Sequence, residues 1–132
     1  MDLAELKRHL HPAFEEFSRQ TVAAYLFGSA AEDGSSGPLS DIDIAVLFSE
    51  RDRGACFDLR LRLYTRLSTL LGRNDIDVLA LNLSGNLVLM DEVVRKGKLL
   101  YETDQEKRFD FETTVLHRAL DFKQQRLAIL GE

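Results

Sequence analysis

The sequence has a single cysteine, no tryptophan and no long apolar run. Cys56 alone cannot form an internal disulfide. No stretch approaches the roughly 20 apolar residues that a membrane-spanning helix needs. Residues 1–20 are charged and have the apolar spacing of a helix, which is not the pattern of a signal peptide. We therefore expect a protein that works in the cytoplasm and contacts no membrane.

Positive charge is also scarce, because 17 Lys and Arg residues stand against 22 Asp and Glu residues and give a net charge of −5. A general nucleic-acid binder neutralises phosphates with a basic surface, so the charge balance argues against that class. Of the 132 residues, 45% are hydrophobic, which is enough for one sizeable core but not for two. We predict a single domain spanning residues 1–132.

The spacing of apolar residues predicts an α/β fold with a small mixed sheet, flanking helices and a long C-terminal helix. Helices are expected over residues 2–19, 53–71 and 85–96 and from Thr103 to about Leu130, and strands over residues 22–27, 41–48, 75–81 and 98–101. Gly72 is expected to cap the second helix. Thr103 and Glu106 have the spacing of a capping box for the last helix.

The C-terminal helix carries two apolar stripes. One stripe consists of Phe109, Leu116, Leu120, Leu127 and Leu130, and the other of Phe111, Val115 and Phe122. A helix on the surface of a domain needs only one apolar stripe to face the core. The second stripe predicts that this helix also meets another layer of its own chain or a partner.

The most informative part of the sequence is an acidic strand, Asp41 to Phe48. Asp41 and Asp43 are two residues apart and therefore point to the same side of the strand. Aspartate is a poor strand former, and two neighbouring carboxylates repel each other unless a cation lies between them. Mg²⁺ prefers carboxylate oxygens and leaves room for water and phosphates. A strand-entry turn would explain Asp41 but not Asp43.

A third carboxylate is expected from the next strand, where Asp75 and Asp77 share a face. If the two strands are neighbours, Asp77 completes a three-carboxylate site, with Asp75 as its rival. Three such ligands can hold two metal ions about 3.5–4 Å apart, the arrangement used for in-line nucleotidyl transfer. Asp75 has a simpler alternative role in the turn after Asn74.

Gly28 and Ser29 follow a buried strand and are candidates for binding phosphate. Glycine allows close backbone approach, and the N–H groups of the turn together with the Ser29 hydroxyl can surround a phosphate. A plain turn is the alternative interpretation. Gly-Ser, a spacer of eleven residues, Asp-x-Asp and a later strand aspartate form one ordered pattern.

This pattern resembles the polymerase-β-type nucleotidyltransferases, and the wider context is similar to the minimal nucleotidyltransferase (MNT) antitoxins of HEPN–MNT toxin–antitoxin modules. The segments that carry the resemblance are residues 24–29, 37–46, 76–82, 97–101 and 108–123. Together they extend over nearly the whole chain. Asp-x-Asp alone would be far less specific.

The resemblance implies a role for each candidate residue. Asp41 and Asp43 would bind two Mg²⁺ ions, and Asp77 would hold the ion nearer the attacking hydroxyl and help to deprotonate it. Gly28 and Ser29 would hold the triphosphate of ATP. Members of this group transfer AMP to a tyrosine hydroxyl of a partner HEPN ribonuclease and thereby block the toxin, which implies a hetero-oligomer with that toxin.

The chain departs from the family pattern in the turn after Gly-Ser. Its spacer is one residue longer than usual, and Glu32 and Asp33 stand where relatives often carry an arginine, which removes a bidentate phosphate contact. This departure implies weaker ATP binding, a different basic donor such as Arg51 or Arg53, or an inactive copy. Two alternative functions follow: an antitoxin that acts by binding alone, and a small-molecule nucleotidyltransferase.

Overall fold

The computed structural model describes residues 2–31 and 41–130. The helices are α1 (Leu3–Glu16), α2 (Arg53–Leu71), α3 (Leu87–Lys96) and α4 (Gln105–Ile129), the strands are β1 (Thr21–Phe27), β2 (Ile42–Phe48), β3 (Ile76–Ala80) and β4 (Lys98–Glu102), and two short 3₁₀ turns are η1 (Gly28–Ala31) and η2 (Leu81–Leu83). Glu32 and Asp33, on which the departure from the family pattern rests, lie outside the described residues.

The four strands form one mixed sheet in the order β3-β2-β1-β4. β1 is antiparallel to both β2 and β4, whereas β2 and β3 are parallel. A parallel pair needs a long crossover between its strands, and α2 supplies it. The predicted α/β class, mixed sheet and long C-terminal helix are therefore confirmed.

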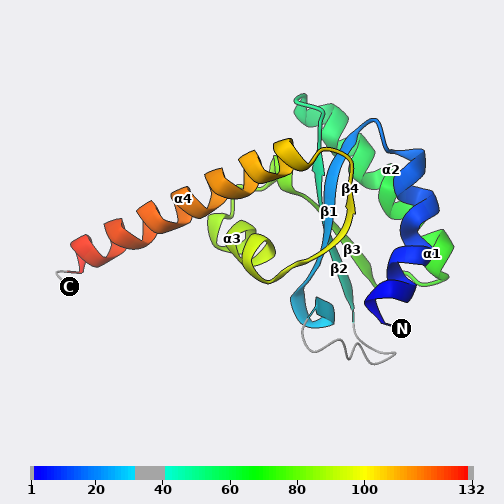
Figure 1. Ribbon diagram of the computed structural model, residues 1–132, viewed down its shortest axis with the longest axis horizontal. Helices are drawn as coiled ribbons and strands as arrows, with labels where there is room; N and C mark the ends of the chain where they lie inside the picture. Colours follow the sequence, from blue (N-terminus) through cyan, green and yellow to red (C-terminus); the bar gives the residue numbers. More distant parts are fainter. Residues whose placement is uncertain (1, 32–40, 131–132) are drawn as a thin grey trace.

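The helices cover both faces of the sheet. α1 and α2 lie on one face, and α3 and the beginning of α4 lie on the other (Figure 1). The alternation along β2 explains this arrangement, since Ile42, Ile44 and Val46 pack into the core beneath α1 and α2. Ala45 and Leu47 pack into the second core, on the opposite face. Asp41 and Asp43 share the side of these last two residues.

Helix ends account for most differences from the expected boundaries. α2 has its predicted limits, and Gly72 ends it in the left-handed conformation, with φ +64° and its N–H donating to the Ser68 carbonyl. α1 ends at Glu16, with Phe17 as its C-cap, three residues earlier than expected. α3 begins after Asn86, whose side chain accepts a hydrogen bond from the Leu89 N–H.

The predicted capping box at the start of α4 is wrong. The N-cap is Asp104, whose carboxylate accepts from the Lys107 N–H. The Thr103 hydroxyl instead donates to the Thr21 carbonyl across the sheet, and the Thr103 N–H donates to the Val22 carbonyl. Tertiary hydrogen bonding to β1 therefore outcompetes the local cap, and the helix begins one residue later.

A polar cluster fixes the first half of α4 to the sheet. The Tyr25 hydroxyl donates to Glu112 at 2.7 Å. Arg108 donates to Glu102 at the end of β4 and, at 2.9 Å, to Glu112. Burial, followed by the hydrogen bond to Glu112, raises the pKa of Tyr25 far above its usual range, so the hydroxyl stays a donor. We call Tyr25, Glu102, Arg108 and Glu112 the α4 anchor.

The second half of α4 extends beyond the body of the molecule (Figure 1). Phe111 and Val115 pack against the core, but Leu120 and Leu127 are 51% and 41% exposed, and Leu130 is also exposed. Of the two predicted stripes, Phe111 and Val115 are the members that pack against the core. Within residues 2–31 and 41–130, no helix combines the length and apolar character needed to cross a membrane.

The side chain of Asn82 completes the hydrogen bonding at the C-terminal end of the β2–β3 pair, which we call the far end. Its carbonyl oxygen accepts from the Phe48 N–H at 2.7 Å, and its amide donates to the Phe48 carbonyl at 2.8 Å. A side-chain amide can take the place of a strand residue because it carries one donor and one acceptor group. The ladder of hydrogen bonds is thus extended past the end of β3.

Candidate active site

The candidate site lies at the other end of the sheet, where a single row crosses three strands. Phe27 at the end of β1 is the register partner of Asp43 on β2. Asp43 is in turn the register partner of Asp77 on β3. Directly opposite residues on neighbouring strands have side chains on the same face. The two aspartates, far apart in sequence, are therefore placed side by side.

Asp41 lies immediately before β2 and is exposed to solvent. It shares the side of Asp43 because two residues separate them. The backbone here is held by its neighbour, as the Ile42 N–H donates to the Asp75 carbonyl at 3.1 Å. The start of the parallel pair therefore positions Asp41 next to the row formed by Asp43 and Asp77.

The electrostatics of Asp43 show that the three carboxylates act on one another. Burial of Asp43, followed by the negative charges of Asp77 and Asp41, raises its pKa above the usual value. Like charges disfavour a further ionised carboxylate, and a nearby cation reverses that effect. The fold thus holds these negative charges together at a cost in stability, which is typical of a binding or catalytic site.

Gly28 is the glycine that this site requires. Its φ is +73°, a left-handed conformation that other residues adopt only with strain. A Cβ built on Gly28 would lie 2.5 Å from the Asp43 Oδ2 atom, well inside contact distance. The absent side chain therefore lets the Asp43 carboxylate lie against the Gly28 backbone. Ser29 follows in the turn η1 and is exposed at the same end of the sheet.

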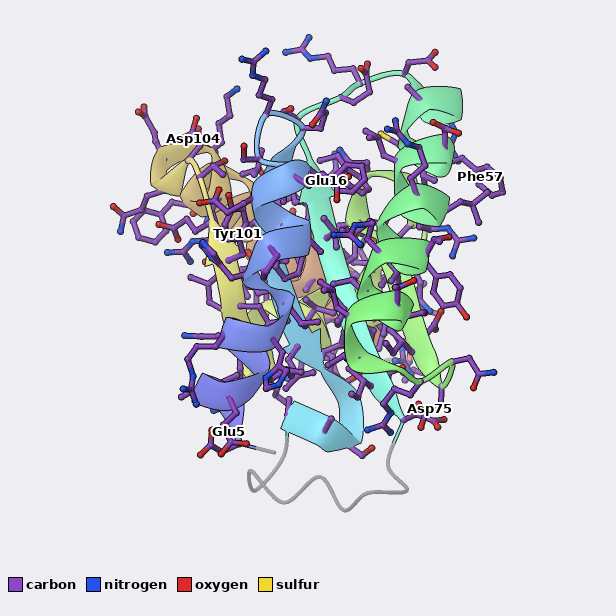
Figure 2. The ribbon with its side chains drawn as sticks, turned by 90° about the vertical axis from the view of Figure 1, so that its right-hand side faces the viewer. Glu5, Glu16, Phe57, Asp75, Tyr101 and Asp104 are labelled. Atoms are coloured by element: carbon purple, nitrogen blue, oxygen red, sulfur yellow. The ribbon has the colours of Figure 1, made fainter. Side chains whose placement is uncertain are left out.

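Asp75 has a different environment from Asp77. Both of its carboxylate oxygens accept hydrogen bonds of 2.5 Å from the guanidinium of Arg73. This contact lowers the pKa of Asp75 below its usual value. Asp75 lies at the lower end of the molecule near η1 (Figure 2). Since its oxygens already bind Arg73, and Asp77 is the residue opposite Asp43, the geometry favours Asp77 as the third carboxylate.

The donor set suits a hard divalent cation, although the side chains do not meet at one point. Among residues 2–31 and 41–130, no three His, Cys, Asp or Glu side chains are close enough together to hold a metal ion. Carboxylate oxygens are nevertheless the ligands that Mg²⁺ prefers, and two of the carboxylates, those of Asp43 and Asp77, belong to register partners. The residues fit Mg²⁺ by chemistry and register, and rotation of side chains would be needed to bind it.

Arg51 and Arg53 are in the wrong place to replace the arginine missing from the turn. They follow the far end of β2, whereas Asp41 and Asp43 stand at its start. A seven-residue strand separates the two ends by about 20 Å. Arg73 is instead a cation at the site end, where the hydrogen bond to Asp75 and, to a smaller extent, the charge of Asp41 raise its pKa. Sequence reasoning missed Arg73, since its only signal was its spacing from Asp75.

A family model matches most of the chain. The family model described as "Polymerase beta, Nucleotidyltransferase" matches residues 10–106. The matched region contains the whole row from Gly28 to Asp77, and it extends through all four strands. No curated protein is similar enough to this chain to count as a match.

Several solved structures share the fold over nearly the full chain. A toxin–antitoxin structure with AMP-PNP has a TM-score of 0.74 at 27% identity, covering 95% of both chains. A complex of a tri-AMPylated Shewanella oneidensis HEPN toxin with its MNT antitoxin has a TM-score of 0.70 at 25% identity, covering 98% of this chain and 96% of that one. The MntA–HepT toxin–antitoxin structure has a TM-score of 0.68 at 26% identity, with 97% and 96% covered.

Proposed function

The chain belongs to the polymerase β nucleotidyltransferase family, and from this premise we propose that it transfers AMP from ATP to a tyrosine hydroxyl of a partner HEPN toxin and thereby neutralises it. The observation that carries the proposal is the row across the sheet, in which Asp43 and Asp77 are register partners and Gly28, which has no side chain, lets the Asp43 carboxylate lie against its backbone. We expect the reaction to run in the cytoplasm, which supplies ATP and Mg²⁺.

The chemistry is a nucleotidyl transfer. The oxygen of the acceptor hydroxyl forms a bond to the α-phosphorus of ATP, the bond between that phosphorus and the bridging oxygen breaks, and pyrophosphate leaves. Asp41, Asp43 and Asp77 would bind two Mg²⁺ ions, which supply charge neutralisation on the attacking and leaving oxygens. A carboxylate oxygen of Asp77 takes the proton of the acceptor hydroxyl, directly or through water.

Gly28 and Ser29 have the position expected for binding the triphosphate. Both lie in the turn after β1, next to Asp43 and on the side of the row away from β3. Ser29 is exposed and can donate its hydroxyl to a phosphate oxygen, while Gly28 keeps side-chain atoms out of the path. This arrangement supports the proposal that ATP binds over β1 and β2.

The exposed half of α4 supports a protein as the acceptor. On this half Leu120, Leu127 and Leu130 are exposed, and the α4 anchor holds the helix in its extended position. The similar structures include a HEPN toxin in complex with an MNT antitoxin and the MntA–HepT pair. We therefore expect a stable hetero-oligomer of this chain with its toxin.

The test is AMP transfer with ATP labelled at the α-phosphate, Mg²⁺ and the protein encoded by the adjacent open reading frame. We expect label on a tyrosine of that protein and its loss in EDTA. Asp41→Asn, Asp43→Asn and Asp77→Asn should each lower the rate at least 100-fold, since each removes a metal ligand. Asp75→Asn is the matched control and should keep most of the activity, because its carboxylate binds Arg73.

An antitoxin that acts by binding alone is the second candidate, favoured by carboxylates that do not converge as a metal site within the described residues. Tight binding of the toxin without any label, unaltered by Asp43→Asn, would establish it and refute AMP transfer. Label on a small hydroxyl compound, with none on the partner protein, would instead indicate a small-molecule nucleotidyltransferase.

A further inference from the structure

A cavity of about 290 Å³ opens at the outer edge of β3, beside the candidate site. The residues that line it include Phe57, Arg60, Asp77, Leu79, Leu83 and Ser84. We call it the β3-edge groove. Pockets for whole small molecules usually measure about 300–1,000 Å³, so this groove has a volume near the lower end of that range.

The position of the groove follows from the order of strands in the sheet. Gly28 and Ser29 follow β1, Asp43 is on β2, and Asp77 is on β3, which is an edge strand. In an in-line transfer the attacking oxygen and the leaving oxygen lie on opposite sides of the phosphorus. With the triphosphate over β1, the acceptor must therefore approach from the side of β3, where the groove begins at Asp77.

The lining of the groove is mostly apolar, with the cation Arg60, the carboxylate Asp77 and the hydroxyl of Ser84. Phe57 is 51% exposed and points away from α2 into solvent (Figure 2). Arg60 donates to the Val78 carbonyl at 3.0 Å, and its guanidinium lies 5.4 Å from the centre of the Phe57 ring. In the part of the chain that the structure describes, no carboxylate of this protein forms a salt bridge with Arg60. An acidic side chain of a partner can therefore pair with it.

We infer that the β3-edge groove binds the segment of the partner protein that carries the acceptor hydroxyl. The hydroxyl residue lies at the Asp77 end, an apolar neighbour packs against Phe57 and Leu83, and an acidic neighbour pairs with Arg60. This inference rests on the proposed function, because it specifies the acceptor of the same site. It makes Phe57 a residue for acceptor specificity rather than for catalysis.

The experiment compares Phe57→Ala with Leu61→Ala in AMP transfer to the partner protein. Both residues are on α2 and largely exposed, at 51% and 44%, but Leu61 does not line the groove. Phe57→Ala should raise the KM for the acceptor about tenfold and leave the KM for ATP unchanged, while Leu61→Ala leaves both within twofold. Arg60→Gln should weaken acceptor binding most at low salt. Equal effects of Phe57→Ala and Leu61→Ala would overturn the inference.

Hydrogen exchange separates failure of the groove from failure of the proposed function. If the unaltered protein transfers no AMP at all, the proposed function fails, and amide exchange is then measured with and without the partner. Protection of residues 77–84 and of the first turns of α2 supports the groove. A partner that binds without protecting these amides, or a partner that does not bind, refutes it.

Discussion

β2 and β3 run side by side, but their two ends are built from different groups. At the far end the Asn82 amide satisfies both the N–H and the carbonyl of Phe48. At the site end Asp43 faces Asp77, and the two negative charges are placed opposite each other. The first arrangement completes the hydrogen bonding of the pair, and the second leaves a repulsion that raises the pKa of Asp43.

The contrast shows that one strand pair can serve stability at one end and function at the other. Sites that bind charged ligands often retain unfavourable interactions that the rest of the fold must offset. Here the offset includes the Asn82 hydrogen bonds and the core beneath α1 and α2. Substitutions at the far end should therefore lower stability, and substitutions at the site end should mainly change activity.

The largest expected effect on stability is that of Asn82→Ala. It leaves the N–H and carbonyl of Phe48, a residue only 2% exposed, without their present partner, which costs about 1–3 kcal/mol for such groups. Urea unfolding measures the loss. Asn74→Ala is the control, since Asn74 is exposed and should change stability by less than about 0.5 kcal/mol. Equal midpoints for the two variants would contradict the proposed role of Asn82.

Next in size is a pair of glycine substitutions, Gly28→Ala and Gly72→Ala. Both glycines have positive φ, at +73° and +64°, so each alanine should cost about 1–2 kcal/mol. A Cβ at Gly72 meets nothing within 4 Å, whereas one at Gly28 displaces the Asp43 carboxylate. We expect similar unfolding midpoints but loss of AMP transfer only in Gly28→Ala. Full activity of Gly28→Ala would exclude a close fit between Gly28 and Asp43.

A smaller, opposite effect is expected for Asp43→Asn. Removing the repulsion with Asp77 should stabilise the protein by less than about 1 kcal/mol at neutral pH without metal. Because the pKa of Asp43 is raised, the folded state keeps a proton that the unfolded chain has lost, at pH values between the unfolded and the folded pKa of this residue. Stability therefore falls as the pH rises from the unfolded pKa to the folded pKa. The increase in the free energy of unfolding caused by Asp43→Asn should therefore grow over that pH range and then level off.

Magnesium provides the converse measurement on the same variant. A ligand that binds only the folded state raises its stability. Mg²⁺ should shift the unfolding midpoint of the unaltered protein upward and leave that of Asp43→Asn unchanged. Equal shifts in both proteins would show that Mg²⁺ binds elsewhere.

The smallest effect is expected for Asp75→Asn, which breaks a partly exposed ion pair with Arg73. The lowered pKa of Asp75 means that its contribution is present at neutral pH and lost as the pH falls through its folded pKa. Thermal unfolding at pH 7 and at acidic pH should therefore show a slight loss only at pH 7. A large loss of AMP transfer in this variant would indicate that Asp75 is a metal ligand.

Much of the fold is readable from the sequence because the hydrophobic periodicity is strong. The alternation along β2 predicts both faces of the sheet correctly, and the limits of α2 follow from its apolar spacing and from Gly72. The capping box was not readable in this way, because a bond from Thr103 to a strand far away in sequence replaced it. Local propensity predicts elements well until a tertiary partner competes for the same group.

Less of the candidate site is readable. Sequence predicts that Asp41 and Asp43 point the same way, but the choice between Asp75 and Asp77 depends on the register of β2 with β3 and on the contact of Asp75 with Arg73. The β3-edge groove is not visible in sequence at all, because Phe57 and Leu83 meet only after α2 folds back over β3. Pairwise geometry between distant segments is the information that periodicity lacks.

The parallel pairing of β2 with β3 also has a kinetic consequence. Asp43 and Asp77 are 34 residues apart in sequence, and the whole of α2 must cross the sheet before they become neighbours. Contacts of such sequence separation form only after the entropy of closing the intervening loop has been overcome. An unfinished chain therefore holds the two carboxylates far from each other, so the proposed metal binding at this row would occur only in molecules that have completed the crossover.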